Sequence, residues 1–228
     1  MSSNLPSQSS SWDADEAIDW ALSQPGRAAL SCSFGGPSGI VVLDMVMRRD
    51  RSVPVYYLDT GLLFPQTYEL AARVAQRYGI EPLAISPWQS VHAQQRTHGA
   101  ALWQRDPNRC CDLRKVQPQA AFLEQYDIWL TGLRRDQSST RAAIPLLQYD
   151  PRFRVTKVNP LAGWSGDDVW QYVRAYDLPY NDLNDRGYPS VGCVPCTRAV
   201  NPGEDVRAGR WPGTEKKECG LHAGGGDR

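Results

Sequence analysis

Four cysteines in two close pairs are the residues of this sequence best suited to hold a metal group. Cys110 and Cys111 are adjacent, and Cys193 and Cys196 form a C-x-x-C pair farther along the chain. Adjacent cysteines rarely bond to each other, because a vicinal disulfide strains the peptide and the S–S geometry. The two pairs therefore predict one site of four thiolates, which suits an iron–sulfur cluster or tetrahedral zinc. The adjacent pair favours the cluster, whose irons lie at separate corners, while zinc and unliganded thiols stay open as alternatives.

A further cysteine, Cys219, has surroundings that suit a nucleophile rather than a metal ligand. Two lysines precede it, and His222 follows three residues later. Nearby cations favour the thiolate, which is the reactive form of cysteine. Gly220 and the glycine run at 224–226 predict a mobile tail that can close over a site. Cys32, in contrast, lies in an apolar stretch and is predicted to be a buried structural residue.

Basic residues gather where they could bind an anion. Arg134, Arg135 and Arg141 follow directly after the strand predicted over 128–131. In an open parallel sheet, ligands bind at the edge where the strands end. Because the guanidinium fork suits phosphate and sulfate, we interpret these arginines as anion-binding residues rather than as a solvated surface.

A glycine-rich turn between a predicted strand and helix could hold a phosphate group at the same edge. Free backbone N–H groups and the helix dipole both point at an anion in such a turn. An ordinary tight turn is the alternative interpretation. Asp59 follows the next predicted strand and is a candidate ligand-binding residue, with an N-cap or turn residue as the alternative interpretation. The glycine-rich turn consists of Ser33, Phe34, Gly35 and Gly36.

Alternating strand and helix signals predict the elements that position these residues. Their order predicts an α/β fold with a doubly wound, mostly parallel sheet. An amphipathic run over 107–126 carries the first cysteine pair, and a loop over 180–191 leads to the second. Strands are expected over 28–33, 53–58, 83–86, 128–131 and 155–159. Helices are expected over 13–22, 40–46, 65–78, 87–98 and 165–176.

The composition limits the classes of protein that the chain can belong to. Of its 228 residues 41% are hydrophobic, and its 25 basic residues balance 25 acidic ones. A net charge of zero gives no overall attraction to nucleic acid or to membranes. No apolar run reaches the roughly 20 residues of a membrane-spanning helix. Six cysteines without a secretion signal indicate a reducing cytoplasm.

Four motifs together resemble the assimilatory adenylyl-sulfate reductases, the iron–sulfur-containing relatives of phosphoadenylyl-sulfate reductases. The motifs are Cys-Cys-x-x-Arg-Lys, Gly-x-Arg-Arg-Asp-Gln-Ser, Gly-Cys-x-Pro-Cys-Thr-Arg and Lys-Glu-Cys-Gly-Leu-His. The resemblance runs from Ala28 to His222. It implies a fold of the adenine nucleotide α-hydrolase-like type and a role in sulfate assimilation and cysteine biosynthesis. We accordingly expect a disordered leader over 1–11, a nucleotide-binding reductase domain with the cluster over 12–212, and a mobile catalytic tail over 213–228.

The resemblance also implies roles for individual residues. One 4Fe–4S cluster per chain would bind the four paired cysteines. Cys219 would attack the sulfur of adenylyl sulfate, AMP would leave, and a cysteine S-sulfonate would remain. Thioredoxin or a similar dithiol would then release sulfite. The implied substrate-anchoring residues are Lys115, Arg141, Arg207 and Arg210, with His222 beside the nucleophile.

One departure from the family pattern concerns the glycine-rich turn. The family often reads Ser-Phe-(Ser/Gly)-Gly-Ala-Glu-Asp there, whereas this chain continues with Pro37-Ser38-Gly39 and lacks the acidic pair. Alternatives to an adenylyl-sulfate reductase are an enzyme for the 3′-phosphorylated nucleotide, or for both, and a tRNA sulfurtransferase-type enzyme. A non-enzymatic module held together by zinc is a third. The motifs leave a homo-oligomer open.

Overall fold

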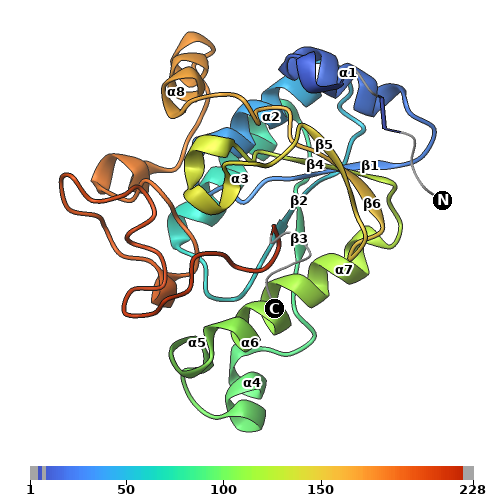
Figure 1. The fold of residues 1–228 in the computed structure, drawn as a ribbon. Coiled ribbons are helices and arrows are strands. Elements are labelled where there is room, and N and C mark those ends of the chain that lie inside the picture. Colours follow the sequence, from blue (N-terminus) through green and yellow to red (C-terminus); the bar gives the residue numbers. More distant parts are fainter. Residues whose placement is uncertain (1–4, 7–8, 223–228) are drawn as a thin grey trace.

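The centre of the molecule is a six-stranded sheet (Figure 1). The computed structural model describes residues 5–6 and 9–222. The strand order is β3-β2-β1-β4-β6-β5, and all neighbours are parallel except β5, which runs antiparallel to β6. The predicted α/β fold with a mostly parallel sheet is therefore confirmed. The strands are β1 (Ala28–Ser31), β2 (Val55–Leu58), β3 (Leu83–Ile85), β4 (Ile128–Thr131), β5 (Leu147–Asp150) and β6 (Val155–Val158).

Helices cover both faces of the sheet, as a doubly wound fold requires. Residues of α1, α2, α3 and α8 share one core with the sheet, whereas the end of α7 belongs to a second core on its other face. In Figure 1, α4, α5 and α6 extend beyond α7, away from the sheet. None of the helices in the described chain is long and apolar enough to cross a membrane. The helices are α1 (Ala14–Ser23), α2 (Pro37–Met47), α3 (Pro65–Tyr78), α4 (Val91–His98), α5 (Leu102–Arg105), α6 (Pro107–Cys111), α7 (Gln117–Leu123) and α8 (Gly166–Ala175).

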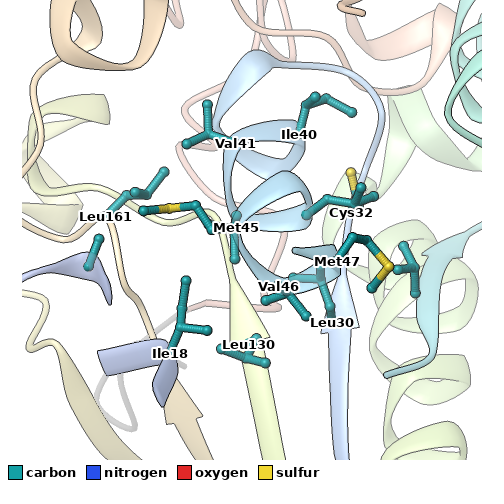
Figure 2. Packing of buried hydrophobic residues seen from close by; sticks show 14 of the residues in the cluster. Ile18, Leu30, Cys32, Ile40, Val41, Met45, Val46, Met47, Leu130 and Leu161 are labelled. Atoms are coloured by element: carbon teal, nitrogen blue, oxygen red, sulfur yellow. The ribbon is translucent and has the colours of Figure 1, made fainter. Parts of the chain in front are cut away.

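Helix α2 forms the centre of the larger core. It is buried on nearly all sides, and Figure 2 shows Val46 next to Leu30 of β1 and Leu130 of β4, while Met45 extends toward Leu161. Burying an aliphatic side chain of this size contributes roughly 1.5–3 kcal/mol. Cys32 is fully buried beside them, which raises the pKa of its thiol to about 12 and confirms the expected structural role. This packing fixes the start of α2, and with it the glycine-rich turn, against the sheet.

The structure differs from the sequence-based expectations at several element ends. Helix α4 begins only at Val91, because the Ser90 side chain accepts the Ala93 N–H and so caps the helix there. A π-helical turn over Asp112–Val116 interrupts the predicted amphipathic run. Strand β5 was not predicted. Within the expected leader, Ser9–Ser11 form a turn of 3-10 helix. Residues 1–4 and 7–8 and the glycine run at 224–226 lie outside the described chain.

Gly132 brings the end of β4 against the first turn of α2. A Cβ atom there would lie 2.7 Å from the Gly39 nitrogen and 2.8 Å from the Ser38 carbonyl carbon, both backbone atoms. We therefore expect Gly132→Ala to lower the free energy of unfolding by about 1–3 kcal/mol, measured by urea denaturation. Gly163→Ala is the matched control, since its Cβ would approach only a side-chain atom of Arg135 at 3.9 Å. Equal unfolding midpoints for the two variants would contradict this account.

Candidate active site

A cavity of about 470 Å³ lies where β1 and β4 end, at the edge predicted to bind a ligand. Its walls come from the glycine-rich turn, from the loop that follows β4, from the loop that follows residue 180 and from the C-terminal segment. Residues that are far apart in the sequence therefore meet in one place. Of the predicted site residues, those that line the cavity are Ser33, Gly35, Gly36, Lys115, Arg134, Arg141, Arg207, Arg210, Cys219 and His222.

Three predicted substrate-binding residues are not among those that line this cavity. Phe34 is fully buried and packs edge-on against Tyr57, with ring centroids 5.5 Å apart. Asp59 accepts a hydrogen bond from the Gly61 N–H at 2.9 Å, which is the turn role given as its alternative. Arg135 is exposed, and its Nε donates to a backbone carbonyl. Each of the three thus has a structural contact elsewhere.

The glycine-rich turn opens directly into α2. Gly36 is the N-cap residue, and Pro37 occupies the first turn of the helix, where its missing N–H costs nothing. The Ser38 hydroxyl is buried and accepts a hydrogen bond from Arg134, which also pairs with Asp136 at 2.9 Å. After its glycines, this chain therefore has a hydroxyl that fixes an arginine at the cavity wall.

The four paired cysteines surround a second, smaller cavity. Cys110 and Cys111 end α6, whereas Cys193 and Cys196 belong to a loop, and all four are buried. Within 5–6 and 9–222, no three His, Cys, Asp or Glu side chains are grouped to hold a single metal ion. All four thiols line one cavity, and a set of four thiolates suits an iron–sulfur cluster or a tetrahedral zinc ion.

Polar side chains contact two of these four thiols through hydrogen bonds to their sulfur atoms. The Thr60 hydroxyl lies 3.2 Å from Cys193 Sγ, and Gln94 Nε2 donates to Cys110 Sγ at 3.8 Å. The buried Arg114 side chain binds both of these residues. Its Nε donates to the Thr60 carbonyl at 2.5 Å, and its Nη1 donates to Gln94 Oε1 at 3.0 Å. Such outer contacts orient and tune metal-binding thiolates.

Burial and charge act in opposite directions on the thiols. Burial raises the pKa of Cys111 to about 11 and that of Cys196 to about 12. Burial alone would lower the pKa of Lys115, but the neighbouring thiolates of Cys193 and Cys219 raise it above its usual value. Lys115 therefore keeps its charge beside the cysteines, where a cation favours thiolates.

Cys219 connects the larger cavity with the paired cysteines. It lines that cavity and packs against the buried side chains of Cys111, Cys193 and Cys196. Burial would raise the pKa of its thiol, but Lys115, a hydrogen bond from the Leu221 backbone and Arg210 together lower that pKa below the usual value. The geometry thus brings a thiol with a lowered pKa to the wall of a polar cavity.

Glu218 already neutralises two of the arginines at this wall. Its carboxylate accepts two hydrogen bonds from Arg141, from Nε at 2.8 Å and from Nη2 at 2.7 Å, and it pairs with Arg207 at 3.3 Å. These side chains are only 10–13% exposed, so solvent screens the ion pairs little. Burial, with Arg141 nearby, lowers the pKa of Arg207 to about 10. Lys115 and Arg210 are the cavity cations that no carboxylate pairs with among the described residues.

Buried polar atoms without a partner mark the same cavity. Native proteins leave few such atoms, so each needs an explanation. Within the described chain, all of the buried side-chain atoms that lack a hydrogen-bond partner belong to residues that line this cavity. They are Thr67 Oγ1, Gln119 Nε2, Asn184 Oδ1 and Arg210 Nε.

Lys157 is a functional candidate that the sequence interpretation missed. It lies in β6 and is 1% exposed, with its Nζ 3.2 Å from His222 Nδ1 and 4.7 Å from the ring centroid of Trp129. His222 stacks on Trp129 at 5.4 Å. Burial lowers the pKa of Lys157 to about 8 and, with the charge of Lys157, that of His222 well below its ordinary value. The lysine, as the one charged residue of the strand predicted over 155–159, was the available signal.

The fold and the site together define an α/β protein with a doubly wound sheet and a polar cavity at the carboxyl edge of that sheet, where open α/β sheets bind ligands. Residues 27–199 match the model of the phosphoadenosine phosphosulfate reductase domain. The chain belongs to this family, which confirms the resemblance seen in its motifs.

Named relatives cover nearly the whole chain. It is 44% identical over 212 residues to the adenosine 5′-phosphosulfate reductase of Halalkalibacterium halodurans, covering 92% of this chain and 91% of the relative. It is 42% identical over 221 residues to the protein of the same name from Geobacillus kaustophilus, covering 96% and 94%. The crystal structure of a phosphoadenylyl-sulfate reductase from Candida auris, a phosphate complex, superposes with a TM-score of 0.72 at 30% identity, covering 83% of this chain and 91% of that one.

Proposed function

We propose that this protein reduces adenylyl sulfate to sulfite and AMP in the cytoplasm, as a step of sulfate assimilation, with thioredoxin or a similar dithiol as reductant. One observation carries the proposal. Cys219 lines the same cavity as Lys115, Arg210 and the partnerless polar atoms. A nucleophile, unpaired cations and unmet hydrogen-bonding groups thus meet where a polar anion would bind. The names of the relatives agree with this substrate.

The reaction proceeds in two transfers at the sulfur of Cys219. Its thiolate attacks the sulfate sulfur, the bond from that sulfur to the bridging oxygen breaks, and AMP leaves with the electron pair. One thiolate of the dithiol then attacks Cys219 Sγ and displaces sulfite. The second thiol of the dithiol closes its disulfide and frees Cys219. The dithiol therefore supplies the two electrons that convert sulfate sulfur to sulfite.

The basic residues reduce the repulsion between a thiolate and an anionic substrate. Lys115 and Arg210 face the cavity without a carboxylate partner in the described chain, so they are free to bind the phosphosulfate group. Charge developing on the leaving AMP phosphate is stabilised by the same cations. The backbone N–H groups at the start of α2 offer further donors at the glycine-rich turn.

The paired cysteines are proposed to hold one 4Fe–4S cluster per chain. Four buried thiols around one cavity, two of them contacted by Thr60 and Gln94, are a suitable donor set. A bound cluster would supply iron–thiolate bonds that join α6 to the loop of the second pair. The proposed ligands are Cys110, Cys111, Cys193 and Cys196.

Sulfite release from two nucleotides tests the proposed substrate. With thioredoxin under anaerobic conditions, we expect turnover of adenylyl sulfate and much slower turnover of its 3′-phosphorylated form. Arg210→Ala should lower kcat/KM for adenylyl sulfate by about 10²–10³-fold, because a cation that stabilises the leaving phosphate is lost. Arg174→Ala, an exposed arginine on α8, is the control and should retain full activity.

Two outcomes would count against this assignment. Faster turnover of the 3′-phosphorylated nucleotide would favour the alternative substrate, which the name of the Candida auris relative supports. Full activity in Arg210→Ala would show that the anion binds elsewhere.

A further inference from the structure

Side chains, rather than backbone hydrogen bonds, hold the tail that carries Cys219. From 215 to 222 the described chain forms no helix, no strand and no backbone-to-backbone hydrogen bond. The red end of the ribbon in Figure 1 nevertheless returns from the outer loops toward the sheet. A segment of this kind keeps one position only when other groups fix it.

The first fixed point precedes Cys219 by one residue. Besides its two hydrogen bonds from Arg141, Glu218 accepts one from the Thr140 hydroxyl at 3.0 Å. The remaining Arg141 nitrogen, Nη1, donates to Gln137 at 2.5 Å. All three nitrogens of this guanidinium therefore bind the protein itself. The contacts engage Arg141 with the tail and its own loop, although the sequence implied a substrate contact.

The second fixed point follows Cys219. Arg152, in the turn between β5 and β6, donates from Nη1 to the Gly220 carbonyl at 2.7 Å and from Nη2 to the Leu221 carbonyl at 3.0 Å. Asp150, itself buried, holds Arg152 through an ion pair of 3.1 Å. A guanidinium fork that reaches two successive carbonyls fixes the direction of the chain as well as its position.

A third contact ends the described tail. The contact of Lys157 with His222, and the stacking of His222 on Trp129, lie on the α7 face of the sheet. Lys157 and Arg152 both belong to the β5–β6 hairpin region, so one edge of the sheet receives the tail from Gly220 onward.

We propose that Arg141 and Arg152 are positioning residues, which clamp the tail on either side of Cys219 and hold its thiol at the cavity. The clamp is inferred from contacts alone, whereas its importance for turnover rests on the proposed function. Glu218, Gly220 and Leu221 are the tail groups that it grips.

The clamp must act in opposite directions on the two transfers of the proposed reaction. Attack on the substrate needs Cys219 held at the cavity, so weakening the clamp slows sulfonation. Release of sulfite needs the adduct to meet a dithiol protein, so weakening the clamp speeds release. A residue with only a structural role would not change the two rates in opposite senses.

Alkylation of Cys219 tests the clamp without using the enzymatic reaction. We expect iodoacetamide to modify Cys219 in Arg152→Ala at least about tenfold faster than in the wild type, because two charge-assisted hydrogen bonds are lost. Peptide mass spectrometry locates the label. Arg154→Ala, an exposed arginine in the same turn, should alkylate at the wild-type rate. Arg152→Lys should restore part of the protection, since an ammonium can still bind one carbonyl.

Glu218→Gln tests the other side of the clamp with little change of shape. Removing the carboxylate charge frees Arg141 and Arg207, so the cavity gains positive charge. We expect tighter binding of AMP, a lower KM for adenylyl sulfate and a lower kcat, together with faster alkylation of Cys219. Loss of folding would lower kcat as well, but it would not tighten AMP binding.

The outcomes separate the clamp from the proposed function. Unchanged alkylation in both Arg152→Ala and Glu218→Gln, with wild-type circular dichroism, would overturn the clamp. Faster alkylation with opposite changes in sulfonation and release supports it. If the variants are alkylated faster but the wild-type protein forms no sulfonate, the clamp stands and the proposed reaction is wrong.

Discussion

Cys219→Ser is expected to abolish sulfite release, lowering the rate by about 10⁴-fold or more, while nucleotide binding persists. A serine hydroxyl stays protonated near neutral pH and is a far weaker nucleophile than the thiolate that Lys115 and Arg210 favour. The substitution leaves the cavity cations in place, so AMP should bind with unchanged affinity. The measurements are anaerobic sulfite release and nucleotide binding by calorimetry.

The covalent adduct gives the sharper test of the same residue. Wild-type protein given adenylyl sulfate without a dithiol should gain one sulfonate, which peptide mapping locates on Cys219 and a dithiol removes. Cys32 is the natural control: it belongs to the residues that line the cavity, but it is fully buried and burial raises the pKa of its thiol to about 12, so it should carry no adduct. A sulfonate on Cys32, or a Cys219→Ser variant that still turns over, would refute the mechanism and leave the metal site untouched.

Cys193→Ser is expected to cost the protein both its iron and much of its stability. A metal group that binds only the folded chain contributes its binding energy to folding, so losing one ligand should lower the free energy of unfolding by on the order of several kcal/mol. The loop with the second cysteine pair has little regular structure apart from the 3-10 turn Val194–Cys196. Iron, acid-labile sulfide and the visible spectrum, with thermal unfolding, measure the effect.

Two controls separate a ligand from a neighbouring thiol. Cys219→Ser should keep the brown colour of the cluster, and so should Cys32→Ala, because neither cysteine is a proposed ligand. Stoichiometric zinc in anaerobically purified protein, without iron or sulfide, would contradict the cluster and favour the zinc alternative.

Local signals predicted most of the fold. Helix α3 begins at Pro65 and ends at Tyr78, as expected, because proline suits the first turn and Gly79 adopts the left-handed φ of 66° that stops a helix. The capping box of Asp13 and Glu16 likewise fixed the start of α1. Strand β5 escaped notice because Leu147–Asp150 lies at the sheet edge and lacks a continuous apolar run.

The candidate site was predictable in its residue types but not in its pairings. Placing cations after predicted strands put Arg134 and Arg141 at the edge of the sheet where the cavity lies. The ion pair between Arg141 and Glu218 joins residues 77 positions apart, and no local pattern specifies such a contact. Lys157 was missed for the same reason, because its partner His222 is distant in the sequence and belongs to a tail without regular structure.

Lys115 and Arg210 line both the larger cavity and the small one between the paired cysteines, so the two sites have a wall in common. Energetic coupling between sites is reciprocal. If substrate draws these cations toward its phosphosulfate group, it weakens their attraction for the thiolates by some free energy. The charge held among the cysteines must then alter substrate affinity by the same amount. The two sites are therefore thermodynamically coupled. A change of charge at one site alters the binding free energy at the other without any movement of the sheet.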